Sequence, residues 1–173
     1  MNTVYYAVSC GDITASLPKN LIEHAVTKQS LNAWSLLSIV YQKAYGEVLD
    51  GVTFDAKGKP LKTGGYISIS HSKGAVAVCF SKTVNCGVDI ELITPKIPAK
   101  TAKLLGVNNV APTTFYTAWT ERESVIKALS KPALAKDLNG LFKGVSKVIE
   151  LNEKKYSLSL YGEDCKFELI KLD

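Results

Sequence analysis

The chain has 173 residues, of which 46% are hydrophobic and 21% charged. This balance is ordinary for a folded globular protein and excludes extensive disorder, and the length predicts one domain or two small lobes packed together. The formal net charge of +5 favours anionic partners such as phosphorylated small molecules, acidic proteins or nucleic acid. Because the lysines are spread along the chain without a dense basic tract, we expect no nucleic-acid partner.

The four cysteines form no CxxC pair, and neither histidine lies near them at zinc-finger spacing. This pattern predicts neither a zinc site nor a disulfide scaffold, and it is typical of a reducing cytosol. The N-terminus has no basic leader followed by an apolar core, and no apolar run approaches the length of a membrane span. We therefore expect a cytoplasmic protein with no membrane partner.

The first elements in chain order are a strand over residues 4–9, a weak helix over 19–27 and a stronger helix over 31–45. Ser30 is the predicted N-cap of the stronger helix, and Gly46 is predicted to end it. Apolar residues recur on one side of this helix at the spacing of a buried stripe: Leu36, Leu37, Val40, Tyr41 and Ala44. The helix is therefore assigned to the core.

Residues 51–65 are rich in glycine and lysine, and two interpretations stay open. The segment forms either a hairpin followed by a turn or a basic loop lying over an anion. The alternation of isoleucine and serine over residues 66–72 predicts a strand with one buried face. Further strands over 75–81 and 86–92 follow at once, so we expect the three to form an antiparallel meander.

The second half predicts a short helix over 99–105, a long helix over 114–130, and strands over 145–151, 155–160 and 165–172. Each half thus resembles the other, a helix followed by an antiparallel meander, which predicts an α+β fold with helices packed on antiparallel sheets. The expected arrangement is two similar lobes, a pseudo-dimer. The lobes would comprise residues 1–85 and 86–173, with the active site at their interface.

Acidic residues recur in two of these elements. In the strand over 86–92, Asp89 and Glu91 point to the same face, about 7 Å apart. In the long helix, Glu123 and Lys127 are four residues apart and also share a face. If strand and helix pack together, three carboxylates and one ammonium group converge, which suits Mg²⁺ and phosphate groups. The alternative is a solvated strand end and a surface ion pair.

Four motifs follow one another along residues 54–141: Gly58-Lys59-Pro60, Ile69-Ser70-His71-Ser72, Gly87-Val88-Asp89-Ile90-Glu91, and Trp119-Thr120-x-x-Glu123-Ser124-x-x-Lys127. In this order and approximate spacing they resemble the 4′-phosphopantetheinyl transferases. The closer similarity is to the surfactin-synthetase-activating type, whose single chain holds two similar lobes. The resemblance implies a transferase, with coenzyme A bound on the side of the first lobe and the metal and pyrophosphate on the side of the second.

The reaction that the resemblance implies moves the phosphopantetheine arm of coenzyme A onto a serine of an acyl carrier protein or peptidyl carrier domain. Adenosine 3′,5′-bisphosphate is released. Such enzymes serve fatty acid, polyketide or nonribosomal peptide biosynthesis, and we expect a cytoplasmic monomer. By resemblance, Asp89, Glu91 and Glu123 would hold Mg²⁺, or alternatively Mn²⁺, while Lys127 would bind the pyrophosphate. Asp89, Glu123 and Lys127 are the expected catalytic residues.

The same resemblance gives the expected coenzyme contacts. Ser70 and His71 would take the 3′-phosphate and neighbouring groups, and Gly58, Lys59 and Pro60 would border the adenine. Trp119 and Ser124 are expected to be packing residues. An arginine that the family places in its first helix is absent, and Lys28 is the candidate substitute.

The chain also departs from the family. Residues 100–109 contain no acidic residue where the family has a proposed glutamate base, and the C-terminus is shorter. A metal-bound water or a ligand carboxylate would have to serve as the base. These departures keep a second hypothesis open, a non-catalytic coenzyme A-binding homologue. A third, a small basic nucleic-acid-binding protein, rests on net charge alone.

Overall fold

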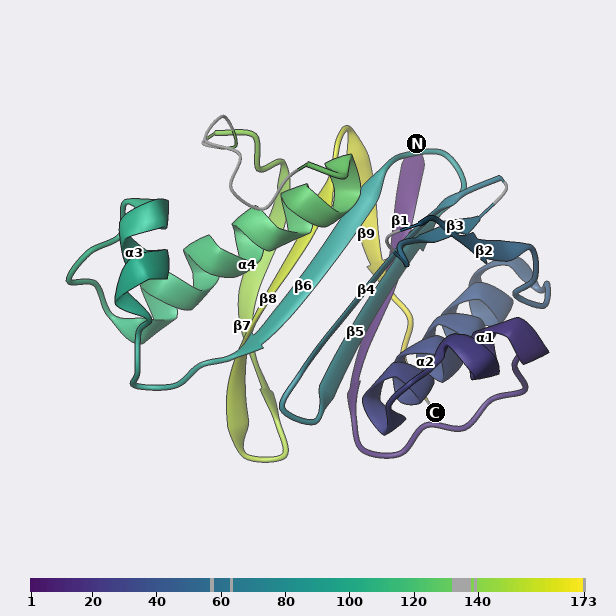
Figure 1. The fold of residues 1–173 in the computed structure, drawn as a ribbon. Coiled ribbons are helices and arrows are strands. Elements are labelled where there is room, and N and C mark those ends of the chain that lie inside the picture. Colours follow the sequence, from purple (N-terminus) through teal and green to yellow (C-terminus); the bar gives the residue numbers. More distant parts are fainter. Residues whose placement is uncertain (57, 63, 132–137, 139, 173) are drawn as a thin grey trace.

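The structure is a computed structural model, and it describes residues 1–172 except 57, 63, 132–137 and 139. The described part is a mixture of helices and strands, which confirms the α+β prediction (Figure 1). In chain order the elements are β1 (Asn2–Cys10), α1 (Lys19–His24), α2 (Lys28–Tyr45), β2 (Val52–Phe54), β3 (Pro60–Lys62), β4 (Tyr66–Ser72), β5 (Ala75–Ser81), β6 (Cys86–Leu92), α3 (Ala99–Leu105), α4 (Pro112–Leu129), β7 (Gly144–Leu151), β8 (Lys154–Gly162) and β9 (Cys165–Leu169).

The first large sheet has the strand order β4-β5-β1-β9. β4 and β5 form an antiparallel hairpin, and β5 also pairs antiparallel with β1. β9 runs parallel to β1, with Asn2 opposite Cys165. The part of the chain beyond residue 85 therefore contributes a strand to the sheet that begins at the N-terminus.

The second large sheet has the order β6-β8-β7, and all of its pairs are antiparallel. The predicted meander over residues 66–92 is thus wrong in its last step, because β6 pairs with β8 and places Asp89 opposite Ser159. The reason is that the other edge of β6 lies beside β4 of the first sheet. There the backbone N–H groups of β6 donate to serine hydroxyl groups of β4 and not to main-chain carbonyl groups of a neighbouring strand.

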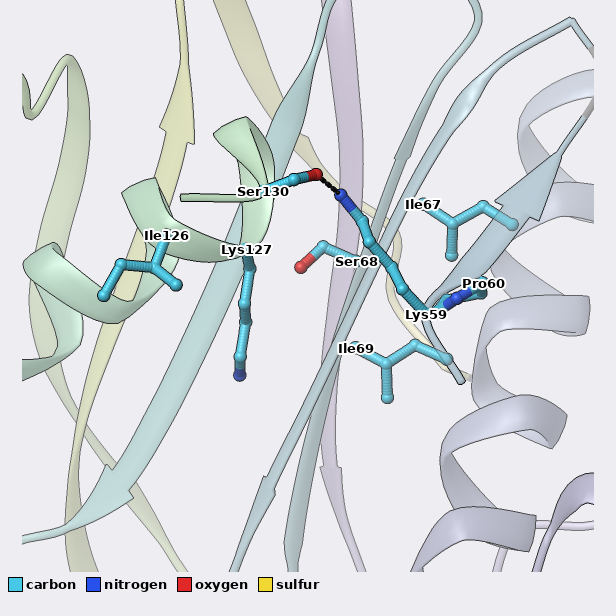
Figure 2. A pocket seen from close by; sticks show the side chains of 8 residues that line it. All are labelled: Lys59, Pro60, Ile67, Ser68, Ile69, Ile126, Lys127 and Ser130. Carbon is cyan, nitrogen blue, oxygen red and sulfur yellow. Dashed lines mark hydrogen bonds between the residues drawn. The ribbon is translucent and has the colours of Figure 1, made fainter. Parts of the chain in front are cut away.

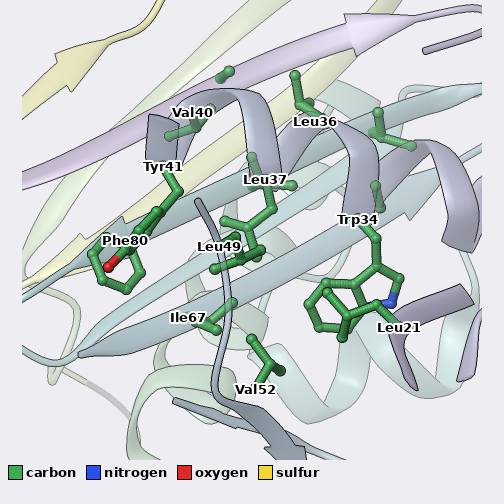
Figure 3. Close-up of a cluster of buried hydrophobic side chains, with 14 residues drawn as sticks. Leu21, Trp34, Leu36, Leu37, Val40, Tyr41, Leu49, Val52, Ile67 and Phe80 are labelled. Carbon is green, nitrogen blue, oxygen red and sulfur yellow. The ribbon is translucent and has the colours of Figure 1, made fainter. Parts of the chain in front are cut away.

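The two sheets and two long helices form four layers. α2 covers one face of the first sheet, and its buried residues Leu36, Leu37 and Val40 pack with Val78 and Phe80 of β5 (Figure 3). The opposite face of that sheet packs on the second sheet through alternate residues of each: Val4, Tyr6, Ala77, Cys79, Val88, Ile90, Leu158 and Leu160. α4 lies against β6 and β8 on the far face of the second sheet.

The ends of α2 show why it occupies residues 28–45. Its N-cap is Thr27, whose Oγ1 accepts a hydrogen bond from the backbone N–H of Ser30 at 3.0 Å. The prediction of Ser30 as the cap is therefore wrong by one turn, because Thr27 already has the extended backbone that capping requires. At the other end Gly46 has a left-handed φ of 70°, which confirms its predicted role.

Two further features of the described residues bear on the sequence analysis. Residues 51–65 contain the antiparallel pair β2–β3, with Val52 opposite Lys62, so the hairpin interpretation is confirmed. No helix in the described part of the chain is both long and apolar enough to cross a membrane.

Candidate functional site

The site begins with the close contact between β6 and α4. A Cβ atom placed on Gly87 would lie 1.9 Å from the carbonyl oxygen of Ser124, a distance that no side chain allows. Only glycine at this position lets the helix lie so close to the strand. Ser124 itself is fully buried and donates to the carbonyl oxygen of Glu121, so it serves in packing as expected. Gly87 is thus the residue that sets α4 against β6.

A partly buried ion pair connects the two elements. Lys127 Nζ lies 2.6 Å from Asp89 Oδ1, and the hydroxyl of Ser70 donates to the same oxygen at 2.7 Å. Asp89 is only 3% exposed. Its second oxygen, Oδ2, is buried and accepts no hydrogen bond from the residues that the structure describes. A buried carboxylate oxygen without a donor is costly, so this atom is suited to a cation or donor supplied by a ligand.

The residues predicted for metal and pyrophosphate line one hollow of about 290 Å³, which we call the acidic hollow. Its walls come from β4, β6 and α4: Ile69, Ser70, His71, Asp89, Glu91, Trp119, Glu123 and Lys127. Six of these eight were predicted as site residues from the sequence. Trp119 was assigned to packing, but the structure places it in the wall of the hollow.

A second hollow of about 160 Å³, the apolar hollow, lies beside the first (Figure 2). It is lined by Lys59, Pro60, Ile67, Ser68, Ile69, Ile126, Lys127 and Ser130. Ile69 and Lys127 line both hollows, so the two hollows adjoin at these side chains, and we call the pair the cleft. Lys59 reaches across from the β2–β3 hairpin and donates from Nζ to the hydroxyl of Ser130 at the end of α4 (Figure 2).

Two predicted coenzyme residues lie outside the lining of this cleft. Lys28 forms an exposed ion pair with Asp12, with its Nζ 2.7 Å from Oδ1. Gly58 lies in the turn between β2 and β3 at a φ of 78°, and a Cβ there would be 3.8 Å from the His24 ring. The structure therefore brings Lys59 and Pro60 to the cleft but not Lys28 or Gly58.

The carboxylates of the acidic hollow destabilise one another. Burial raises the pKa of Glu123, and the charge of Asp89 raises it further, while Lys127 acts in the opposite direction. Burial also raises the pKa of Glu91; a hydrogen bond from Ser72 opposes this, and Asp89 adds to it. One ammonium group thus faces three carboxylates, and the hollow favours additional positive charge.

We expect Glu123→Gln to raise the melting temperature at about pH 7 in the absence of divalent ions, because glutamine removes a buried charge. A carboxyl group whose pKa is raised on folding destabilises the folded state when the pH is above the raised pKa. The destabilisation vanishes when the pH falls below the ordinary pKa of 4.5, because the group is then protonated in both states. The gain should therefore disappear near pH 4 in thermal unfolding experiments. Glu23→Gln, which alters an exposed ion pair with Lys19, is the control and should show no such pH dependence. An equal gain at both pH values would contradict the prediction.

The acidic hollow is the candidate site for a divalent metal ion. Within the described part of the chain, no group of three or more His, Cys, Asp or Glu residues lies close enough to hold one. The chemistry of the donors nevertheless suits an oxygen-seeking cation, since the three candidate ligands are carboxylates and Asp89 Oδ2 accepts no hydrogen bond from the described residues. The assignment of Asp89, Glu91 and Glu123 as ligands therefore stays a prediction.

Comparison of the chain with protein-family models and with curated proteins found no match. The assignment of function therefore depends on the residues of the cleft and on the motifs that carry them.

Sequence reasoning missed the apolar wall and the serine contacts of the cleft. Ile126 and Ser130 line it because α4 ends above β4, which no local pattern indicates. Ser72 donates to Glu91 Oε2 at 2.8 Å, and Ser70 to Asp89. The alternation of serine with isoleucine in β4 was a visible signal, but it predicted only a strand with one buried face.

Proposed function

We propose that the chain is a divalent-cation-dependent transferase that acts on a diphosphate ester. More specifically, we propose a 4′-phosphopantetheinyl transferase, which modifies a serine of an acyl or peptidyl carrier protein with the phosphopantetheine of coenzyme A. One observation supports this most directly. Asp89, Glu91, Glu123 and Lys127 line a hollow that adjoins a second hollow bordered by Lys59 and three isoleucines.

In this proposal the cleft supplies complementary environments for the parts of coenzyme A. Lys127 lies where the two hollows meet and would contact the pyrophosphate, and Lys59 would release Ser130 to contact a phosphate or the adenine. Ile67, Ile69 and Ile126 offer an apolar surface of the kind that stacks or packs against a base.

Asp89, Glu91 and Glu123 would hold Mg²⁺ or Mn²⁺, and the ion would supply charge neutralisation for the pyrophosphate. In the reaction, the carrier serine hydroxyl gives up its proton to a carboxylate of the hollow, and its oxygen forms a bond to the β-phosphorus. The bond to the leaving phosphate breaks, and adenosine 3′,5′-bisphosphate departs with that electron pair. The protein residues bind and orient the diphosphate and keep its charge paired in a partly enclosed site. The net charge of +5 favours association with an acidic carrier domain.

The two-lobe arrangement is part of the same proposal. Each large sheet is covered by one 18-residue helix, α2 on the first and α4 on the second. The cleft lies where β4 of the first sheet meets β6 and α4 of the second. Lobes over residues 1–85 and 86–173 would therefore share the site, with β9 returning to the first sheet.

A second candidate function is a coenzyme A-binding homologue without turnover. It is favoured by the ion pair in which Lys127 Nζ, 2.6 Å from Asp89, already compensates the most buried carboxylate. This candidate predicts coenzyme A binding that does not depend on a divalent ion.

Transfer of phosphopantetheine is the deciding measurement. The protein is incubated with coenzyme A, Mg²⁺ and several apo-carrier proteins of the fatty-acid, polyketide and peptide classes, and intact carrier masses are recorded. We expect a gain of one phosphopantetheine on at least one carrier, and loss of the gain when the metal is chelated. Coenzyme A binding by calorimetry with no mass gain on any carrier would favour the second candidate. If the protein neither binds coenzyme A nor transfers phosphopantetheine, both candidate functions are rejected.

A further inference from the structure

The edge between the two large sheets is held by serine side chains. Three serines alternate along β4, and their hydroxyl oxygens accept hydrogen bonds from backbone N–H groups of β6. Ser68 accepts from Val88 at 3.0 Å, Ser70 from Ile90 at 3.3 Å, and Ser72 from Leu92 at 3.2 Å. We call this set the serine ladder. It satisfies the edge of β6 where the predicted meander would have placed main-chain carbonyls.

Two of the three hydroxyl groups also donate to a carboxylate of the acidic hollow. Ser70 donates to Asp89 Oδ1 at 2.7 Å, and Ser72 donates to Glu91 Oε2 at 2.8 Å. A serine hydroxyl has one proton to donate, so both protons are committed to carboxylates. Ser68 makes the same backbone contact, and among the described residues its hydroxyl donates to no carboxylate.

Burial strengthens the contact of Ser70 most. Ser70 and Asp89 are 6% and 3% exposed, whereas Ser72 and Glu91 are half-buried. A hydrogen bond that also carries charge is shorter and stronger than a neutral one, particularly away from water. Each hydroxyl group is held in place by the hydrogen bond that it accepts from a backbone N–H group. In turn, it donates to one carboxylate oxygen and holds that oxygen in place. The orientation of Asp89 and Glu91 therefore depends on a strand of the other sheet.

We propose that Ser70 and Ser72 are positioning residues that orient the Asp89 and Glu91 carboxylates toward the acidic hollow, and that Ser70 does not contact the 3′-phosphate of the coenzyme. The proposal deepens the function proposed above and rests on it only where coenzyme A is concerned. In metal sites, residues that hydrogen-bond the ligands typically contribute 10- to 100-fold to metal affinity.

The test compares Ser70→Ala and Ser72→Ala with Ser68→Ala, a matched control that loses the same kind of backbone bond but no carboxylate contact. Amide hydrogen exchange should accelerate at Ile90, Leu92 and Val88 in the three variants respectively. Mn²⁺ affinity, measured by calorimetry without substrate, should fall about 10-fold in the first two and stay near wild type in Ser68→Ala. Ser70→Thr, which keeps a hydroxyl, should recover most of the Mn²⁺ affinity.

A second comparison tests the excluded role of Ser70. If Ser70 bound the 3′-phosphate, Ser70→Ala would lose the preference for coenzyme A over 3′-dephospho-coenzyme A; we expect that preference to be unchanged. Equal Mn²⁺ affinity in all three alanine variants, or loss of the coenzyme preference, would overturn the proposal.

The experiments distinguish failure of the proposed enzymatic function from failure of the proposed positioning role of the serine ladder. If the wild-type protein binds Mn²⁺ but transfers nothing, the ladder can still be confirmed while the enzymatic proposal fails. If the wild type binds no Mn²⁺, the side-chain carboxyl ¹³C signals of Asp89 and Glu91 decide instead. Those signals should shift in Ser70→Ala and Ser72→Ala respectively and remain in place in Ser68→Ala; no shift would reject the ladder's positioning role.

Discussion

Asp89→Asn is expected to lower phosphopantetheine transfer by at least about a thousandfold while the protein still folds. Asp89 is the carboxylate that Ser70 and Lys127 both contact, and its buried Oδ2 has no donor among the described residues. Asparagine keeps the shape and an oxygen for those contacts, but it removes the negative charge. The side chain of Lys127 is 30% exposed, so water can partly solvate its ammonium group in the variant and the fold should persist.

Transfer rates are measured with saturating coenzyme A and carrier over a series of Mg²⁺ concentrations, and folding is checked by thermal unfolding. Asp12→Asn is the control, because Asp12 forms an ion pair with Lys28 outside the cleft and its loss should leave transfer unchanged. Full activity of Asp89→Asn at saturating Mg²⁺ would contradict the proposed role of Asp89 as a metal ligand. A variant that does not fold would show instead that the ion pair is mainly structural.

Gly87→Ala is expected to lower the free energy of unfolding by about 3 kcal/mol and the melting temperature by about 6–12 °C. The added Cβ would lie 1.9 Å from the Ser124 carbonyl oxygen, and Gly87 and Ser124 lie within the regular backbone of β6 and α4, which cannot yield locally. α4 must therefore move away from β6. This movement would carry Glu123 and Lys127 away from Asp89, so Mn²⁺ affinity and coenzyme binding should fall even at temperatures where the variant is folded.

Gly144→Ala is the matched control for the Gly87 variant. It places a Cβ 1.8 Å from the Leu160 carbonyl oxygen, a clash of the same severity in the same sheet. Gly144 lies in β7 and lines neither hollow of the cleft. We expect both variants to lose stability in thermal unfolding, but only Gly87→Ala to lose Mn²⁺ affinity in calorimetry. Unchanged stability in Gly87→Ala would show that the helix accommodates the methyl group without moving.

Much of the local structure follows from the sequence because it depends on neighbouring residues. The alternation of Ile and Ser in β4, and the helical spacing of Glu123 and Lys127 in α4, are determined by the repeat of each element. Gly46 ends α2 because its left-handed backbone strongly favours glycine. Asp89 and Glu91 fall on one face of β6 for the same kind of local reason, and both line the acidic hollow.

The sequence by itself therefore determined the α+β class, most of the helices and strands, and the identity of the acidic and basic residues that line the cleft. Only the tertiary structure decided that β6 pairs with β8, that Trp119 and Ser130 line the cleft, and that Lys28 pairs with Asp12 away from it. The physical reason is that a strand's repeat fixes which face a side chain takes but not which strand lies beside it. That choice depended on long-range contacts, namely the serine hydroxyl groups at the edge of β6 and the absence of a side chain at Gly87.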